Sequence, residues 1–157
     1  MSISKEEFRA ALGRFASGVT IVTTRDTEGN LHGLTVSAFS SVSLQPSLVL
    51  VCIEKSAGSH HAFENGGAFV VNILREDQQA ISNQFASRIF DKFAGINYRL
   101  GIEDLPVLND ALVNLECRQT NAHDAGDHTI YIGEIEKVTV TDGNPLIYFH
   151  GNYREIN

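Results

Sequence analysis

Three short segments combine residue types that could bind or activate a small molecule. The first, residues 35–43 (Thr-Val-Ser-Ala-Phe-Ser-Ser-Val-Ser), repeats small hydroxyl side chains inside a strand-like stretch. Small side chains let a planar ligand approach the backbone, whose N–H groups can then donate to its heteroatoms. An edge strand followed by a serine-rich turn would have the same composition, because Ser and Thr are common in turns. Both interpretations stay open on composition alone.

The second segment, residues 54–59 (Glu-Lys-Ser-Ala-Gly-Ser), follows an apolar run and precedes a short helical pattern. The ammonium of Lys55, the hydroxyls of Ser56 and Ser59, a flexible glycine and a helix N-terminus together suit a phosphate group. The alternative is a helix capped by Ser59 with Lys55 in solvent, because caps are more common than anion sites.

The third segment, residues 123–128 (His-Asp-Ala-Gly-Asp-His), is turn-like and precedes a long alternating run. Two imidazoles and two carboxylates, from His123, Asp124, Asp127 and His128, raise the alternative of a metal site. Ligands this close in sequence rarely all point inward, so we favour a hydrogen-bonding His128 held by Asp127. A plain hairpin turn is the remaining alternative.

Composition and missing motifs exclude several function classes. The 157 residues fit one domain, and 12 Lys and Arg against 19 Asp and Glu give a formal net charge of −7. Without a basic run, neither a nucleic acid nor a membrane is an expected partner. The chain contains no Gly-x-Gly, His-Glu-x-x-His or Gly-x-Ser-x-Gly. The usual nucleotide-loop, zinc-protease and nucleophile-elbow signatures are therefore absent.

The two cysteines and the lengths of the apolar runs indicate in which cellular compartment the protein is expected. Cys52 and Cys117 lie far apart in apolar runs and form no Cys-x-x-Cys pair, which predicts free thiols in a reducing environment. The N-terminal residues lack the apolar core of a signal peptide, and the longest apolar run, residues 47–53, is far shorter than a bilayer span. We therefore expect a cytoplasmic protein.

Strand patterns dominate the elements that must position these segments. Alternating or β-branched apolar runs predict strands at residues 19–24, 31–38, 47–53, 68–74, 113–118, 129–140 and 145–149. Turn chemistry at residues 26–30 joins the first two runs into a hairpin. In the run 129–140 the apolar phase changes near Gly133, so we expect a bulge or bend there.

Helix signals are few. Ser4 and Glu7 form a capping box before an apolar stripe, which predicts a helix that ends near Gly18 and lies against a sheet.

Two shorter helices are expected at residues 60–64 and 76–87. His60 and His61 would then lie on a solvated helix face, whereas His32 and His150 carry no signal. Residues 88–108 lack periodicity and predict a long loop with local turns. Many short strands with few peripheral helices indicate a mainly β, antiparallel barrel or sandwich.

Taken in order, several segments resemble those of a known family. They are residues 8–20 (FRAALGRFASGVT), 32–44 (HGLTVSAFSSVSL), 69–74 (FVVNIL), 84–86 (QFA), 126–129 (GDHT) and 145–153 (PLIYFHGNY). Their order and spacing resemble the flavin reductases, which are FMN-binding split-barrel oxidoreductases and small components of two-component flavin monooxygenases. The resemblance runs nearly end to end. Ser37 stands where many members carry Asn, and Ser47 where a second proline is common.

The resemblance implies a six-stranded antiparallel split β-barrel with a few peripheral helices, formed as a single domain over residues 1–157. It also implies a homodimer with FMN or FAD near the interface. The cofactor-binding residues that it implies are Thr35, Val36, Ser37, Ser41, Val42, Ser43, Lys55, Ser56, Ser59, Phe85, Asp127, His128 and Tyr153. Residues 35–43 would hold the isoalloxazine ring, and residues 55–59 would lie near the flavin phosphate.

The resemblance also implies that His128 is the catalytic residue, oriented by Asp127 and in contact with the nicotinamide of NADH or NADPH. We expect a slot between residues 35–43 and the turn at Gly126, and no metal.

The implied function is an NAD(P)H:flavin oxidoreductase that supplies reduced flavin to a separate monooxygenase by diffusion. The cofactors carry the hydride chemistry, so no protein nucleophile is needed. The alternative is a flavin-binding storage or sensing protein without significant reductase turnover. Asp127 and His128 argue against that alternative, because a pure binder needs no nicotinamide site.

Overall fold

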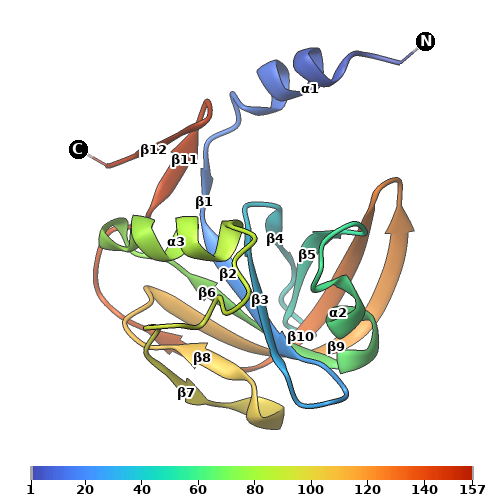
Figure 1. The fold of residues 1–157 in the computed structure, drawn as a ribbon, viewed down its shortest axis with the longest axis vertical. Coiled ribbons are helices and arrows are strands. Elements are labelled where there is room, and N and C mark those ends of the chain that lie inside the picture. Colours follow the sequence, from blue (N-terminus) through green and yellow to red (C-terminus); the bar gives the residue numbers. More distant parts are fainter. Residues whose placement is uncertain (1, 157) are drawn as a thin grey trace.

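Seven strands form one antiparallel sheet in the computed structural model, which describes residues 2–156 (Figure 1). They are β2 (Thr20–Arg25), β3 (Leu31–Val36), β4 (Phe39–Ser43), β5 (Leu48–Glu54), β6 (Ala68–Ile73), β9 (Val113–Ala125) and β10 (His128–Val140). Their spatial order is β3-β2-β6-β9-β10-β5-β4. The prediction of a mainly β, antiparallel fold is confirmed, and each predicted strand before residue 141 has a counterpart, but the main sheet has seven strands and not the six that the resemblance implies.

The two edge strands of this sheet are consecutive in the sequence. Only Ser37 and Ala38 join β3 to β4, and β3 also contacts β5. Three Cα–Cα steps of about 3.8 Å reach no further than about 11 Å. The sheet must therefore curl until its two edges approach each other, which agrees with a split-barrel architecture.

The hydrophobic core fills the inside of the curled sheet. Phe63, Phe69 and Tyr131 are fully buried at its centre, with valines of β2, β5 and β6 around them. A second cluster packs beneath α3 (Gln79–Ala86), where Phe85 lies against Ile21 and Leu74. This packing fixes the strands whose ends carry the candidate segments.

Strand β10 carries the expected irregularity at Gly133. Its register against β9 shifts between Ile132 and Gly133, and again between Ile135 and Lys137. A Cβ atom on Gly133 would lie 2.6 Å from Cζ of Phe69. The predicted bulge is confirmed, and the close approach of a buried ring explains why glycine is needed there.

The region between residues 88 and 108 is more ordered than the sequence indicates. Two short strands, β7 (Tyr98–Leu100) and β8 (Pro106–Leu108), pair as a small sheet around the 3-10 turn η2 (Ile102–Asp104). The prediction of a loop with only local turns is wrong here. Three-residue strands are too short to show an alternating pattern.

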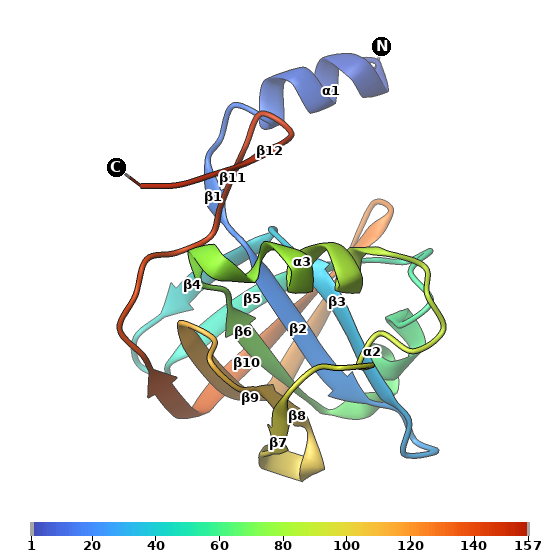
Figure 2. The ribbon, with the colours of Figure 1, turned by 60° about the vertical axis from the view of Figure 1, so that its left-hand side comes forward.

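The first helix, α1 (Lys5–Leu12), begins at the expected capping box, in which the Glu7 backbone N–H donates to Ser4 Oγ at 3.1 Å. It ends at Gly13 and not near Gly18. The expected packing against a sheet is also wrong, because no residue of α1 is buried. Figure 2 shows the helix standing clear of the main sheet.

The C-terminal residues form a hairpin beside the chain entering the main sheet. Strands β11 (Ile147–Phe149) and β12 (Asn152–Arg154) pair with each other, and β11 pairs with β1 (Ser17–Gly18) (Figure 2). The remaining helical segments are α2 (His60–Gly66) and the 3-10 turn η1 (Glu76–Gln78) before α3. Within residues 2–156, none of the helices has the length and apolar character needed to cross a membrane.

Candidate functional site

Three adjacent strands bring parts of all three candidate segments to one end of the sheet. His128, at the start of β10, pairs with Glu54 at the end of β5. On the other side of β5, the backbone N–H of Cys52 donates to the carbonyl of Ala38 at 3.0 Å. Neighbouring strands lie about 4.8 Å apart, and the register places Phe39, at the start of β4, across β5 from Tyr131, so the start of β4 is about 10 Å across from β10 and three residues along it from His128.

Asp127 and His128 form a short hydrogen bond, with 2.7 Å between Asp127 Oδ1 and His128 Nδ1. This hydrogen bond, together with the charge of the imidazole, lowers the pKa of Asp127. An ionised carboxylate only accepts, so Nδ1 is the donor. The other ring nitrogen, Nε2, has no protein hydrogen-bond partner in residues 2–156. The His128 side chain is 40% exposed, so Nε2 is open to a ligand.

Lys55 joins the turn after β5 to the turn that carries Asp127. Its backbone N–H donates to the Asp127 carbonyl at 2.8 Å, and its Nζ lies 3.5 Å from Asp124 Oδ1. Ser56 is exposed in the same turn. Lys55 and Ser56 are therefore accessible at the surface beside His128.

Ser59 is placed differently from its neighbours in this turn. It is only 8% exposed, and its Oγ lies 3.3 Å from His32 Nδ1. It makes no capping hydrogen bond to α2. Both sequence interpretations of its hydroxyl, as a helix cap and as a surface phosphate contact, differ from this inward orientation. The partner, His32, lies 27 residues away in the chain, so no local pattern indicates it.

Residues 35–43 divide into a supporting half and an open half. Thr35 Oγ1 donates to the Ser82 carbonyl at 2.6 Å, and Val36 lies in the core. The remaining expected contacts, Ser37, Ser41, Val42 and Ser43, are exposed or half-buried. Within the sheet, β4 pairs only with β5, so the backbone groups on its other edge point away from the sheet. The segment is thus an edge strand, and its open edge offers backbone donors.

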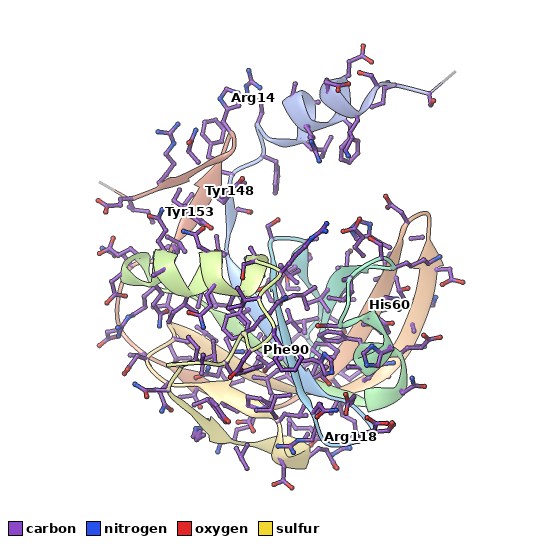
Figure 3. All side chains as sticks on the ribbon, in the orientation of Figure 1. Arg14, His60, Phe90, Arg118, Tyr148 and Tyr153 are labelled. Carbon is purple, nitrogen blue, oxygen red and sulfur yellow. The ribbon has the colours of Figure 1, made fainter. Side chains whose placement is uncertain are left out.

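Two expected cofactor contacts, Phe85 and Tyr153, lie on α3 or contact it. Phe85 is fully buried, and a Cβ on Gly33 would lie 2.7 Å from its Cε1. Direct contact between Phe85 and a surface ligand is therefore contradicted, because the ring packs behind β3. Tyr153 lies on the C-terminal hairpin, where its hydroxyl is 2.8 Å from Ser82 Oγ (Figure 3). Through Ser82, Tyr153 and Thr35 belong to one hydrogen-bonded group.

A cavity of about 390 Å³ opens between α2 and the β9–β10 hairpin. Its lining residues are Lys55, His60, Glu64, Ala122, Asp124, Thr129 and Tyr131. None of them belongs to residues 35–43, so the expected slot between that segment and the Gly126 turn is not formed by this cavity.

His60 is the main feature of this cavity that the sequence does not indicate. Its Nε2 lies 2.9 Å from Thr129 Oγ1 and 3.3 Å from the Tyr131 hydroxyl. Figure 3 shows His60 on α2, directed toward the sheet. The prediction of a solvated helix face for this residue is wrong. Burial also raises the pKa of Tyr131.

The metal alternative for residues 123–128 is not supported. His123 and Asp124 are adjacent on β9, so their side chains point to opposite faces of the hairpin. Asp124 contacts Lys55, and Asp127 contacts His128. In the part of the chain that the structure describes, these four residues do not form a group with ligand atoms close enough for one ion.

Comparison with known proteins adds to this geometry. Residues 12–157 match the family described as flavin reductase like domain. The chain is 42% identical over 152 residues to an NADH-dependent flavin reductase from Rhodococcus sp, covering 94% of this chain and 84% of that protein. It is 38% identical over 156 residues to the flavin-dependent monooxygenase reductase subunit HsaB of Rhodococcus jostii, covering 99% and 80%.

A further relative, from Rhizobium meliloti, is 40% identical over 145 residues, but the chain spans only 47% of its length. Among solved structures, the NADH:FAD oxidoreductase SgcE6 of Streptomyces globisporus, in complex with NAD and FAD fragments, is similar with a TM-score of 0.93. It is 31% identical, and the match covers 98% of this chain and 93% of that one.

Proposed function

Because this chain belongs to the flavin reductase like domain family, we infer that it is an NAD(P)H-dependent flavin reductase acting on FMN or FAD. The observation that carries this proposal is the gathering of Lys55, Asp127 and His128 where β5 ends and β10 begins, with β5 lying between β10 and the open edge strand β4. Relatives named as an NADH-dependent flavin reductase and as an NADH:FAD oxidoreductase support the same substrates.

The residues present fit a flavin on the outer face of β4, β5 and β10. Leu50 and Cys52 on β5 and Ile130 and Ile132 on β10 are half-buried and pair directly across the two strands. They form an apolar surface next to the open backbone edge of β4. A flat, largely apolar ring with polar edge atoms suits such a surface. When bound there, the flavin would supply the site with its capacity to accept a hydride.

The protein's own contribution is binding and orientation. His128 is the residue that we assign to the nicotinamide, because its Nε2 is open while Asp127 holds Nδ1. The Asp127 hydrogen bond fixes both the ring orientation and the tautomer, so the nitrogen that meets the ligand is defined before binding. Such positioning brings the two reactants together without a protein nucleophile.

Lys55 and Ser56 are assigned to the flavin phosphate, since both are accessible in the turn beside His128. Ser59 supports that turn from inside through His32. In the same way Thr35 and Tyr153 support the flavin surface from behind through Ser82. Residues 37–43 are the part of their segment that touches the ring.

We also propose that the 157 residues act as one domain and that two copies form a homodimer. Phe8, Leu12 and Phe15 near the N-terminus and Val42 and Leu44 near the flavin surface are exposed. Large apolar side chains left exposed on two elements of one chain are suited to a protein interface. A second copy covering these residues would supply the missing wall of the expected slot. Light scattering at micromolar concentration should give the mass of a dimer, and a monomer mass would contradict this part.

Reduced flavin would leave the site and reach a separate monooxygenase. The relative named as a flavin-dependent monooxygenase reductase subunit supports this class of partner.

The test is steady-state oxidation of NADH and NADPH by the purified protein with added FMN or FAD. We expect flavin-dependent turnover with at least one pair. Tight flavin binding without oxidation of either nicotinamide would contradict the proposal and favour a storage or sensing protein.

A further inference from the structure

A second polar cluster, outside the lining of the cavity, lies where Asp26, His32 and His61 meet. Asp26 follows β2, His32 lies on β3 and His61 lies in the first turn of α2. Each offers one ligand atom, and these atoms lie within 4.8 Å of one another. We propose that the cluster is a binding site for a divalent transition-metal ion of the zinc type.

The distances suit one ion shared by the three side chains. Asp26 Oδ2 lies 2.9 Å from His32 Nε2 and 3.9 Å from His61 Nε2. The two imidazole rings stand nearly perpendicular, at 88°, with centroids 5.0 Å apart. Ligands of a tetrahedral zinc at about 2.1 Å are separated by about 3.4 Å, so the two measured distances lie on either side of that value.

The inner two ligands are held in place by further hydrogen bonds. The backbone N–H groups of Glu28 and Asn30 donate to Asp26 Oδ1 at 3.0 and 2.9 Å. His32 Nδ1 lies 3.3 Å from Ser59 Oγ, which leaves Nε2 facing Asp26. Metal-binding histidines usually place their other ring nitrogen on such an oxygen, which fixes the ring.

Burial increases from the outer ligand to the inner ones. The side chains of His61, His32 and Asp26 are 58%, 19% and 9% exposed. In the metal-free protein His32 Nε2 donates to Asp26 Oδ2 at 2.9 Å, and a bound ion would displace that proton to solvent and take its place. Asp26 Oδ2 also accepts from Asn30 Nδ2 at 3.1 Å, and His61 can close over an ion from the solvent side.

The donor set decides which ions fit. Imidazole nitrogens suit zinc, copper, nickel and iron, whereas magnesium and calcium prefer oxygen ligands alone. Three protein ligands leave a fourth zinc position for water or another ligand. Ser59, the last residue of the turn 55–59, contacts the cluster through His32 Nδ1. A bound ion would therefore stiffen the turn that carries Lys55. The metal assignment itself rests on the cluster's geometry and is independent of the flavin.

The test uses untagged, chelator-treated full-length protein titrated with Zn²⁺ by calorimetry, and with Co²⁺ by visible absorption. We expect saturable binding of one ion per chain. His61→Ala should weaken Zn²⁺ binding at least tenfold, and it should fold normally because His61 is exposed. His123→Ala, an exposed histidine outside the cluster, is the matched control and should bind like the wild type.

A second readout does not depend on flavin or turnover. Zn²⁺ should raise the melting temperature of the wild type and of His123→Ala, but not that of His61→Ala, since a ligand stabilises only a state that binds it. The proposal is overturned if the wild type binds no ion saturably, or if His61→Ala binds as tightly and is stabilised as much as the wild type.

Discussion

Two histidines lie on opposite sides of the start of β10, and the structure holds them in different ways. His60 is 16% exposed, and its Nε2 is shared by the hydroxyls of Thr129 and Tyr131. His128 is 40% exposed and has one partner, Asp127, on Nδ1. A ring nitrogen shared by two largely buried hydroxyls belongs to the folded structure. A ring nitrogen open to solvent can meet a ligand.

The side chains of β10 alternate between the inner and outer faces of the sheet, which explains why His60 and His128 have different surroundings. Thr129 and Tyr131 point inward and are buried, whereas His128 and Ile130 lie on the outer face and are half-buried. Substitutions of inward residues should therefore lower stability, and substitutions of outward residues should change ligand binding.

The largest effect is expected on the inner side, at Tyr131. Tyr131→Ala should lower the free energy of unfolding by about 3–5 kcal/mol, because it removes a fully buried aromatic ring. Tyr131→Phe keeps the ring and should lower it by only about 1 kcal/mol. Urea unfolding measures both. A loss below about 1 kcal/mol for the alanine variant would contradict a structural role for this inward-facing ring.

His60→Ala should lower the free energy of unfolding by about 1–3 kcal/mol, because the buried Thr129 hydroxyl loses its partner. The KM for NADH should stay close to the wild-type value. Thermal melting and steady-state kinetics on the same preparation check both parts. If the KM rises as much as in a His128 variant, the two histidines do not differ as described.

On the outer side, His128→Ala should raise the KM for NADH by about tenfold, equivalent to about 1.4 kcal/mol. The dissociation constant for flavin should change much less, and the melting temperature should not change. Wild-type kinetics in this variant would show that the histidine does not meet the nicotinamide.

A smaller effect is expected for Asp127→Asn, because the amide oxygen can still accept from His128 Nδ1. We expect the KM for NADH to rise less than in His128→Ala. The pKa of Asp127 is lowered in the folded protein, so its stabilising contribution is present above about pH 4 and is lost as the pH falls through the lowered value. Below about pH 4 the difference in stability between the wild type and Asp127→Asn should shrink. A difference that grows as the pH falls would contradict the hydrogen bond between Asp127 and His128.

The smallest effect concerns the two thiols. Burial raises the pKa of Cys117 to about 12, and Cys117 is fully buried, so it should resist alkylation. Cys52 is half-buried on the outer face of β5, and burial raises its pKa as well. We expect slow labelling of Cys52 alone at alkaline pH, and slower labelling with saturating flavin. Equal labelling with and without flavin would place the ring elsewhere.

Local patterns predicted the strands well because the signals lie within a few residues. The capping box at Ser4, the hairpin at residues 26–30 and the bulge at Gly133 depend on neighbours or on a phase change within one strand. Features that depend on distant partners were missed or wrong. The pairing of β7 with β8 leaves no periodic signal in the sequence, and the apolar stripe of α1 predicts a packing partner that the structure of one chain does not supply.

The candidate site follows the same rule. Asp127 and His128 are adjacent, so the sequence could predict their hydrogen bond. His60 meets Thr129 across 69 residues of chain, and Phe85 packs behind β3 through contacts made by the whole α3 helix. Which side of β10 faces the core is set by the curl of the complete sheet. The sequence alone therefore could not separate the structural histidine from the exposed one.

The most direct measurement is a crystal structure of the protein with FMN and NAD⁺ bound. We predict that the flavin ring lies over β5, with hydrogen bonds to the backbone of residues 37–43, and that the nicotinamide contacts Nε2 of His128. A flavin ring inside the cavity between α2 and the β9–β10 hairpin, or a nicotinamide remote from His128, would contradict the account.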